Sequence, residues 1–130
     1  MGYTRYWERT DKPITDDFLE KVEEIIKDSA KKGIAIRGWD GSGKPILNLT
    51  RIALNGNGKA DKDLSHESFV IDDEVGFQFC KTARKPYDYT IRKILKLAKD
   101  YGLVTKVSSD GANNKVYSDE EYLLGLVDWN

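Results

Sequence analysis

Within twelve residues, from Phe77 to Asp88, the chain changes from a strand pattern to a helix pattern. The first residues alternate aromatic side chains with others, as a half-buried strand does. Pro86 suits the first position of a helix, because its missing N–H would lack a partner there anyway. Few residues lie between the two patterns, so a short turn must join a strand directly to a helix. This junction constrains the fold more than any other segment.

The turn at this junction is rich in side-chain hydrogen-bond donors. They are Lys81, Thr82, Arg84 and Lys85. The free N–H groups at a helix N-terminus add the positive end of the helix dipole, so a phosphate or carboxylate would bind well here. Basic residues before a helix are also common as plain solvated surface, and the local sequence leaves both interpretations open.

The composition indicates a folded protein of one domain, spanning residues 1–130. Hydrophobic residues make up 39% and charged residues 33% of the chain, a balance typical of globular proteins rather than disordered or membrane ones. No apolar run approaches the ~20 residues that span a bilayer, and residues 1–7 contain no apolar signal segment. We therefore expect a cytosolic protein.

Charge and cysteine content exclude several other classes. The net charge is −1, so no global field would hold a long nucleic acid or a membrane surface. One cysteine cannot form an internal disulfide, and one cysteine with one histidine does not supply a zinc site. We expect no metal and no cofactor.

Hydrophobic periodicity and end signals predict mixed secondary structure. We expect helices from Thr15 to Gly33, from Pro86 to Gly102, and a short one beginning at Ser118. We expect strands at residues 2–9, 34–37, 46–54, 67–71, 75–80, 103–108 and 115–117. The run 55–58 predicts a tight turn. Without regular alternation, this order predicts an α+β fold: a mainly antiparallel sheet packed with two main helices and a short C-terminal helix.

A glycine-rich stretch at residues 38–44 has the glycine and lysine spacing of a P-loop. Pro45 stands where a P-loop needs a Ser or Thr for magnesium, and a strand follows in place of a helix. A plain glycine-rich turn is the better interpretation. Arg37 and Trp39 at its mouth could still stack on a ligand or pair with it.

Candidate catalytic groups are few. His66 and Glu67 could act as a general acid and base, and Cys80 could be a nucleophile with His66 as its partner. Cysteine beside Phe79 is more often a small core residue. Binding is therefore favoured over chemistry.

Aromatic residues supply a possible surface for stacking. They are Tyr3, Tyr6, Trp7, Trp39, Tyr87 and Tyr89. Half of an alternating strand must face the core, so some of them are structural, above all Tyr6 or Trp7. The others could stack on nucleobases, at about 1–3 kcal/mol for each base. Bases on aromatic faces, with phosphates on the cationic turn, would make a nucleotide pocket.

Several short motifs resemble those of a widespread group of small phage and prophage proteins. They are residues 2–7 (Gly-Tyr-Thr-Arg-Tyr-Trp), 54–56 (Leu-Asn-Gly), 66–69 (His-Glu-Ser-Phe), 77–88 and 109–111 (Ser-Asp-Gly). The chain departs from the group's pattern at Arg5, where a histidine is frequent, and at Leu54, where an aromatic residue is frequent. The chain is also similar to phage anti-CBASS sponges. That resemblance implies a tetramer that sequesters a host cyclic dinucleotide such as 3′3′-cGAMP without cleaving it.

From the residues and the resemblance together, we expect a phage immune-evasion protein that binds a cyclic nucleotide in the host cytoplasm as a homo-oligomer. We expect phosphate on Lys81, Arg84 and Lys85, with the Thr82 hydroxyl as a further donor. A base would pack on Trp7, Trp39 or Tyr87. Base edges would be read by Asn55, His66 and Glu67, and Asp88 would orient Arg84 or cap the helix.

Two alternatives remain open. One is a small nucleotide hydrolase or phosphodiesterase that uses His66 and Glu67. The other is an inhibitor of a host protein, docking through the basic residues of the second helix, Arg92, Lys93, Lys96 and Lys99.

Overall fold

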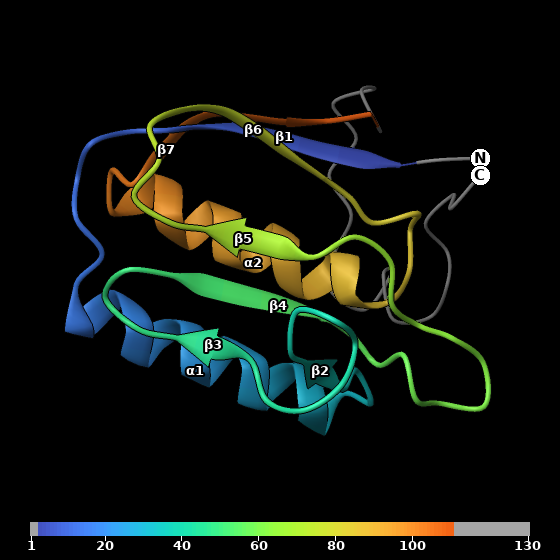
Figure 1. The fold of residues 1–130 in the computed structure, drawn as a ribbon. Helices are drawn as coiled ribbons and strands as arrows, with labels where there is room; N and C mark the ends of the chain where they lie inside the picture. Colours follow the sequence, from blue (N-terminus) through green and yellow to red (C-terminus); the bar gives the residue numbers. More distant parts are fainter. Residues whose placement is uncertain (1–2, 111–130) are drawn as a thin grey trace.

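The computed structural model describes residues 3–110, which form two helices and seven strands (Figure 1). In chain order the elements are β1 (Thr4–Arg9), α1 (Asp16–Lys31), β2 (Ile36–Arg37), β3 (Ile46–Leu47), β4 (Ile52–Gly56), β5 (Phe69–Ile71), β6 (Gly76–Lys81), α2 (Tyr87–Asp100) and β7 (Val104–Ser109). All strand pairs are antiparallel, so the predicted α+β class is confirmed. The predicted strand at 115–117 and the short C-terminal helix lie outside the described residues.

Helix α1 begins and ends at the signals that the sequence contains. The Thr15 hydroxyl accepts a hydrogen bond from the Phe18 N–H, which satisfies one of the unpaired donors of the first turn. After the helix, Gly33 adopts a positive φ of 86°, and the Ile34 N–H bonds back to the Ser29 carbonyl. This cap uses residues that the sequence pattern assigns to the next strand, so β2 starts only at Ile36.

Helix α2 follows the Pro86 signal, and its buried face is wide. Pro86 has helical dihedrals and immediately precedes the first assigned residue, Tyr87. The buried side chains of α2 are Tyr87, Asp88, Tyr89, Thr90, Ile91, Ile94, Leu95 and Ala98. Gly102 ends the last turn at a φ of 76°. A helix buried over so much of its surface must be packed on several sides.

The first sheet has the strand order β6-β1-β7. Each residue of β1 faces one of β6, from Thr4 opposite Lys81 to Arg9 opposite Gly76. On the β7 side, the register shifts between Tyr6 and Glu8, as a bulge produces. The N-terminal strand of the chain is therefore the centre of this sheet.

The second sheet is built around β4, which pairs with β2, β3 and β5. The strand predicted over residues 46–54 is interrupted, because Asn48 accepts hydrogen bonds from Thr50 and from the Arg51 N–H and so closes a turn. The tight turn predicted at residues 55–58 is also displaced, since Asn55 and Gly56 belong to β4. Asn48 and Asn55 both have side chains that can form a turn. Only Asn48 does so, because the side chain of Asn55 bonds to Trp39 and His66 in other segments.

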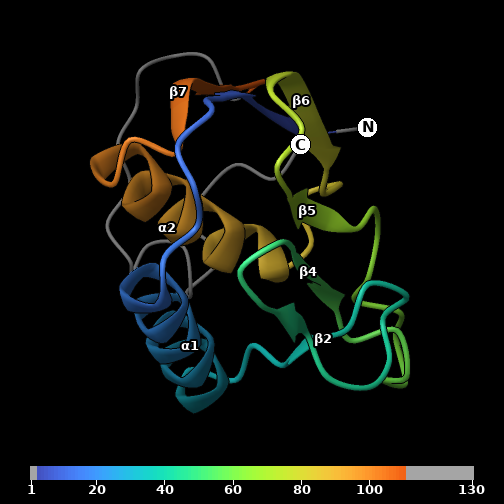
Figure 2. The ribbon, with the colours of Figure 1, turned by 60° about the vertical axis from the view of Figure 1, so that its left-hand side comes forward.

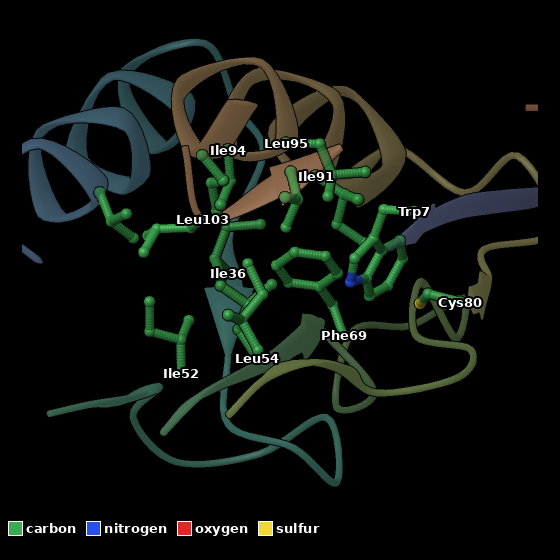
Figure 3. Packing of buried hydrophobic residues seen from close by; sticks show 14 of the residues in the cluster. Trp7, Ile36, Ile52, Leu54, Phe69, Cys80, Ile91, Ile94, Leu95 and Leu103 are labelled. Atoms are coloured by element: carbon green, nitrogen blue, oxygen red, sulfur yellow. The ribbon is translucent and has the colours of Figure 1, made fainter. Parts of the chain in front are cut away.

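The two sheets and two helices enclose one cluster of buried hydrophobic side chains. In both ribbon views α2 lies between α1 and the first sheet, with β4 and β5 beside it (Figures 1 and 2). The Trp7 ring from β1 packs against the Phe69 ring from β5, with centroids 5.3 Å apart (Figure 3). The helices are joined by a buried hydrogen bond of 2.7 Å between the hydroxyls of Ser29 and Thr90.

Neither helix in the described range, residues 3–110, has the length and apolar character needed to cross a membrane.

Candidate functional site

The turn that joins β6 to α2 is a tight one with an unusual backbone. The Lys85 N–H bonds to the Thr82 carbonyl at 3.0 Å, and the two residues between them, Ala83 and Arg84, have φ values of 51° and 55°. Positive φ at both central positions defines a type I′ turn. Main-chain hydrogen bonds from residues 82 and 83 to the Tyr3 carbonyl anchor the turn to the N-terminal strand.

Beneath this turn lies a buried ion pair. Arg5 donates to the two carboxylate oxygens of Asp88 at 2.7 and 2.8 Å, and both side chains are more than nine-tenths buried. The Thr82 hydroxyl donates to the same carboxylate at 2.9 Å. Thr82 is fully buried, so the prediction that its hydroxyl contacts a ligand is wrong.

The N-terminus of α2 therefore already contains an anion. Asp88 lies in the first helical turn, where a negative charge interacts favourably with the dipole. Two roles were expected for Asp88, to orient Arg84 or to cap the helix, but its ion-pair partner is Arg5, and α2 has no side-chain cap hydrogen bond. Any external phosphate must bind to exposed side chains around the turn, because the helix end is occupied by the protein's own carboxylate.

Two of the three candidate stacking residues are in the core. Trp7 is 1% exposed and packs on Phe69 (Figure 3). Tyr87 is equally buried, and its hydroxyl donates to the Glu67 carbonyl at 2.8 Å. Burial also raises the pKa of Tyr87 well above its usual value. Neither ring offers a face to a base, so these two assignments are corrected.

Asn55 is also buried, and its side chain is fully used inside the protein. Its amide nitrogen donates to the carbonyls of Trp39 and His66, at 3.1 and 2.9 Å. Its amide oxygen accepts from the main-chain N–H groups of Gly56 and His66. Asn55 therefore cannot read a base edge. It ties the glycine-rich turn to the segment that precedes β5, and Ser68 adds a hydrogen bond to the same Trp39 carbonyl.

Seven predicted residues remain, and all of them except Arg84 lie in the segments that this tie and its neighbouring hydrogen bonds join. We call these six the loop cluster: Arg37, Trp39, His66, Glu67, Lys81 and Lys85. Arg37 faces Asn55 across the β2–β4 pair, and the Trp39 side chain is 57% exposed. His66, Glu67 and Lys81 are exposed, whereas Arg37 and Lys85 are half-buried. Hydrogen bonds thus link the three segments that carry six of the eleven predicted site residues.

Hydrogen bonds connect the cationic turn to the rest of the loop cluster. The Lys81 N–H donates to a Glu67 carboxylate oxygen at 3.1 Å, and the Glu67 N–H donates to the Lys81 carbonyl. The Lys85 ammonium donates to the Asp63 carbonyl at 2.7 Å. Hydrogen bonds from Ser65, with a contribution from the nearby Lys85 and His66 charges, lower the pKa of Asp63. Asp63 therefore stays ionised beside the cations.

Arg84 points to a different neighbour. Its guanidinium lies over the Tyr3 ring, 4.4 Å from the centroid, and the Arg5 guanidinium lies 5.5 Å from the centroid of the same ring. Stacking of this kind holds a guanidinium in a fixed orientation. The structure therefore groups Arg84 with Tyr3 and the buried ion pair.

The structure does not favour Cys80 as a nucleophile. Its thiol is fully buried and donates weakly to the carbonyls of Glu67 and Ser68. Burial raises the pKa of this thiol far above its usual value, so the reactive thiolate is strongly disfavoured. Within residues 3–110, no three His, Cys, Asp or Glu side chains gather in a way that could hold a metal ion.

Sequence reasoning missed the two residues that organise the loop cluster. It interprets Asn55 as a ligand contact, and it assigns no role to Asp63. Their only local signal is that both types often bond to main-chain groups in turns. Their actual partners lie elsewhere in the sequence, which no local pattern reveals.

Comparison of the chain with protein-family models, with curated proteins and with solved structures finds no match.

Proposed function

We propose that the protein binds a phosphate-bearing cyclic nucleotide signal at the loop cluster and sequesters it without cleaving it. The observation that carries this proposal is the Asn55 tie, which holds the Trp39 and His66 segments together beside Lys81 and Lys85. An exposed indole and lysine ammonium groups on linked segments offer a base a stacking surface and a phosphate its cations. In this proposal the protein is a phage immune-evasion factor of the host cytoplasm.

Each member of the loop cluster then has a distinct role. Lys81 and Lys85 bind phosphate oxygens, and Trp39 stacks on a base. His66 and Glu67 hydrogen-bond to base edges, since an imidazole and a carboxylate together offer donor and acceptor groups. Arg37 adds a further positive charge beside Trp39, and Arg84 remains a candidate phosphate ligand at the rim of the turn.

The binding free energy that nanomolar affinity requires favours a homo-oligomer. Nanomolar binding corresponds to about 12 kcal/mol, whereas one stacked base supplies about 1–3 kcal/mol. A cyclic dinucleotide carries two bases and two phosphates, and one loop cluster exposes a single indole, that of Trp39. We therefore propose that two copies of the chain enclose one ligand, with the tetramer implied by the resemblance as one arrangement that allows this.

Calorimetry tests the binding. Wild-type protein is titrated with 3′3′-cGAMP and with a panel of other cyclic and linear nucleotides, and Trp39→Ala and Lys81→Ala are compared with wild type. We expect each substitution to weaken binding by tenfold or more. Lys99→Ala, an exposed lysine on α2 outside the loop cluster, is the matched control and should bind like wild type. Absence of heat with every nucleotide overturns the proposal.

Ligand recovery separates sequestration from hydrolysis. The complex is denatured by heat, and the released nucleotide is analysed by chromatography. Intact nucleotide supports a sponge. Cleaved nucleotide, with cleavage lost in His66→Ala and Glu67→Ala, instead supports the hydrolase alternative.

A further inference from the structure

The outer face of β6 exposes an unusual amount of apolar surface. Phe77 is 63% exposed and Phe79 47%, and Val75, just before the strand, is 60% exposed. The Phe77 ring is stacked on Tyr6 of β1, with centroids 6.0 Å apart, and also contacts the Phe79 ring. Contiguous exposed aromatic surface of this kind marks an interaction site more often than chance exposure does.

These side chains border a groove between β6 and β5. The groove has a volume of about 360 Å³, and its lining includes Val70, Asp72, Glu74, Val75, Phe77 and Phe79. The two strands belong to different sheets, so the groove separates one sheet from the other. A volume in this range is typical of ligand-binding clefts.

The main chain of β6 presents hydrogen-bonding groups toward the groove. At Lys81 both main-chain groups point away from β1, because the N–H donates to the Glu67 side chain and the carbonyl accepts from the Glu67 N–H. In an antiparallel pair, the N–H and C=O groups of successive residues point to opposite sides of the strand. Those of Phe77 and Phe79 therefore point to the same side as those of Lys81, away from β1. Across residues 3–110 these groups form no ladder with β5, whose partner is β4.

The two ends of the groove differ in structure and charge. At one end the Glu67–Lys81 hydrogen bonds close it. At the other end the connection from β5 to β6 carries Asp72, Asp73 and Glu74, of which the last two are exposed. The groove therefore combines an apolar wall, an open strand edge and an acidic end.

We propose that this groove captures a short extended peptide from a partner protein, with apolar side chains at alternate positions and a basic residue at the acidic end. Main-chain hydrogen bonds to Phe77 and Phe79 add the peptide to β6 as a strand, the mode called β-augmentation. Its apolar side chains contact the rings of β6 and Val70. This interaction does not depend on the proposed nucleotide function.

Other occupants fit the groove less well. The carboxylates of Asp72 and Glu74 repel phosphates, which disfavours a nucleotide. A second copy of the chain would have to bring a folded strand edge into the groove, and the Glu67–Lys81 bonds close one end of it. A short flexible segment can lie along Phe77 and Phe79 between the two ends of the groove.

Peptide display tests the proposal while the partner protein is still unidentified. A random heptapeptide library on filamentous phage is panned on wild-type protein, with counter-selection on the Phe77→Ser/Phe79→Ser variant. We expect enriched peptides to alternate apolar residues and to carry Lys or Arg. Resynthesised peptides, followed by fluorescence anisotropy, should bind the variant at least tenfold more weakly.

Two further measurements address the main-chain bonds and the charge. N-methylation of alternate peptide amides should lower affinity at least tenfold in one register and little in the other, and this readout needs no protein variant. Glu74→Lys should weaken binding severalfold, whereas Thr105→Lys on β7, a change to the same cationic side chain outside the groove, should not. Nucleotide binding should survive Glu74→Lys and Thr105→Lys, since neither residue lies in the loop cluster, whereas Phe79 contacts the Lys81 ammonium.

Three outcomes would overturn the peptide proposal. The first is failure to enrich any peptide on wild type over the double variant. The second is enriched peptides that tolerate N-methylation in both registers. The third is sedimentation that shows a wild-type dimer dissociated by Phe77→Ser/Phe79→Ser, because a second copy would then occupy the groove.

Discussion

At the scale of single residues, the most consequential interaction is the ion pair between Arg5 and Asp88. It fixes the first turn of α2 against the middle of the first sheet, and it orients the Thr82 hydroxyl inward. Paired charges in an interior of low polarity are sensitive to the loss of either partner, because the remaining charge is left without compensation. The pair therefore has a structural role in the segment that the sequence marked as an anion site.

Removal of one partner should be far more damaging than removal of both. We expect Asp88→Ala to lower the free energy of unfolding by about 3–5 kcal/mol, since the buried Arg5 guanidinium then loses both of its hydrogen bonds to the Asp88 carboxylate. Arg5→Met combined with Asp88→Leu should recover a large part of this loss. Urea denaturation measures all three proteins, with Lys99→Ala as a surface control within about 0.5 kcal/mol of wild type. A loss below about 1 kcal/mol in Asp88→Ala would contradict a stabilising pair.

The buried thiol and phenol should make the protein sensitive to alkali. Burial raises the pKa of Cys80 and Tyr87 above their usual values of 9.0 and 10.0. Above these values the unfolded chain loses protons that the folded chain retains, so stability falls as pH rises, by up to about 1.4 kcal/mol per pH unit for each group. Below about pH 9 the contribution is fully present.

Denaturation at several pH values between about 8 and 11 measures this loss. Tyr87→Phe should flatten the decline above about pH 10, and Cys80→Ala should flatten it above about pH 9. The native thiol should also react slowly with a thiol reagent and at full rate once unfolded. A fast native reaction would show that Cys80 is accessible.

At the scale of elements, the turn between β6 and α2 contains backbone strain. Ala83 and Arg84 both occupy the left-handed region, which costs a residue with a side chain about 1–2 kcal/mol. The turn is nevertheless the link that brings Lys81 and Lys85 to the loop cluster. Hydrogen bonds to the Tyr3 carbonyl hold it in place.

Ala83→Gly should therefore stabilise the protein. Relief of about 1–2 kcal/mol is partly offset by about 0.4–1 kcal/mol of extra unfolded-state entropy, which leaves a net gain of roughly 0.5–1 kcal/mol. Ala30→Gly, an exposed position within α1, is the opposite control and should cost about 0.5–1 kcal/mol. Thermal denaturation of the two variants should show shifts of opposite sign. Equal destabilisation by both would rule out strain at Ala83.

The Asn55 tie makes a second prediction at this scale. Asn55→Asp keeps the shape of the side chain but removes the donors to the carbonyls of Trp39 and His66. We expect a loss of about 1–3 kcal/mol, because two buried acceptors lose their partner. The segment between β4 and β5 should also become more sensitive to trypsin at Lys59 and Lys62. Unchanged cleavage rates there would mean that other contacts hold the segment.

At the scale of the whole molecule, two sheets share one core. The Trp7–Phe69 contact joins the first sheet to the second, and α2 packs between the first sheet and α1. Neither sheet has a separate hydrophobic cluster of its own among residues 3–110. Unfolding of one sheet would expose the apolar face of the other.

We therefore expect cooperative unfolding in a single transition. In a Trp39→Phe/Trp129→Phe background, Trp7 fluorescence reports the core, and far-ultraviolet circular dichroism reports the helices. Both denaturant transitions should coincide within error, as a two-state protein requires. Separate midpoints would show that the two sheets unfold independently.

The helices and several strand positions could be predicted because their signals are local. Thr15 and Gly33 bound α1, Pro86 precedes α2, and alternation of aromatic residues identifies β1 and β6. The turns were harder, because Asn48 and Asn55 carry similar turn chemistry within one apolar run. Asn48 forms a turn and Asn55 lies in a strand, and the difference comes from the bonds of Asn55 to Trp39 and His66, which are distant in the sequence.

The sequence by itself determined the α+β class and the cationic turn before α2, since periodicity, caps and charges are properties of neighbouring residues. Only the tertiary structure decided which of those residues can meet a ligand. Arg5 lies 83 positions from Asp88, yet it neutralises that carboxylate. Trp7 and Tyr87 have the same ring chemistry as an exposed stacking residue, but contacts from distant strands bury them. Burial is set by the packing of segments far apart in the chain, and no local pattern contains it.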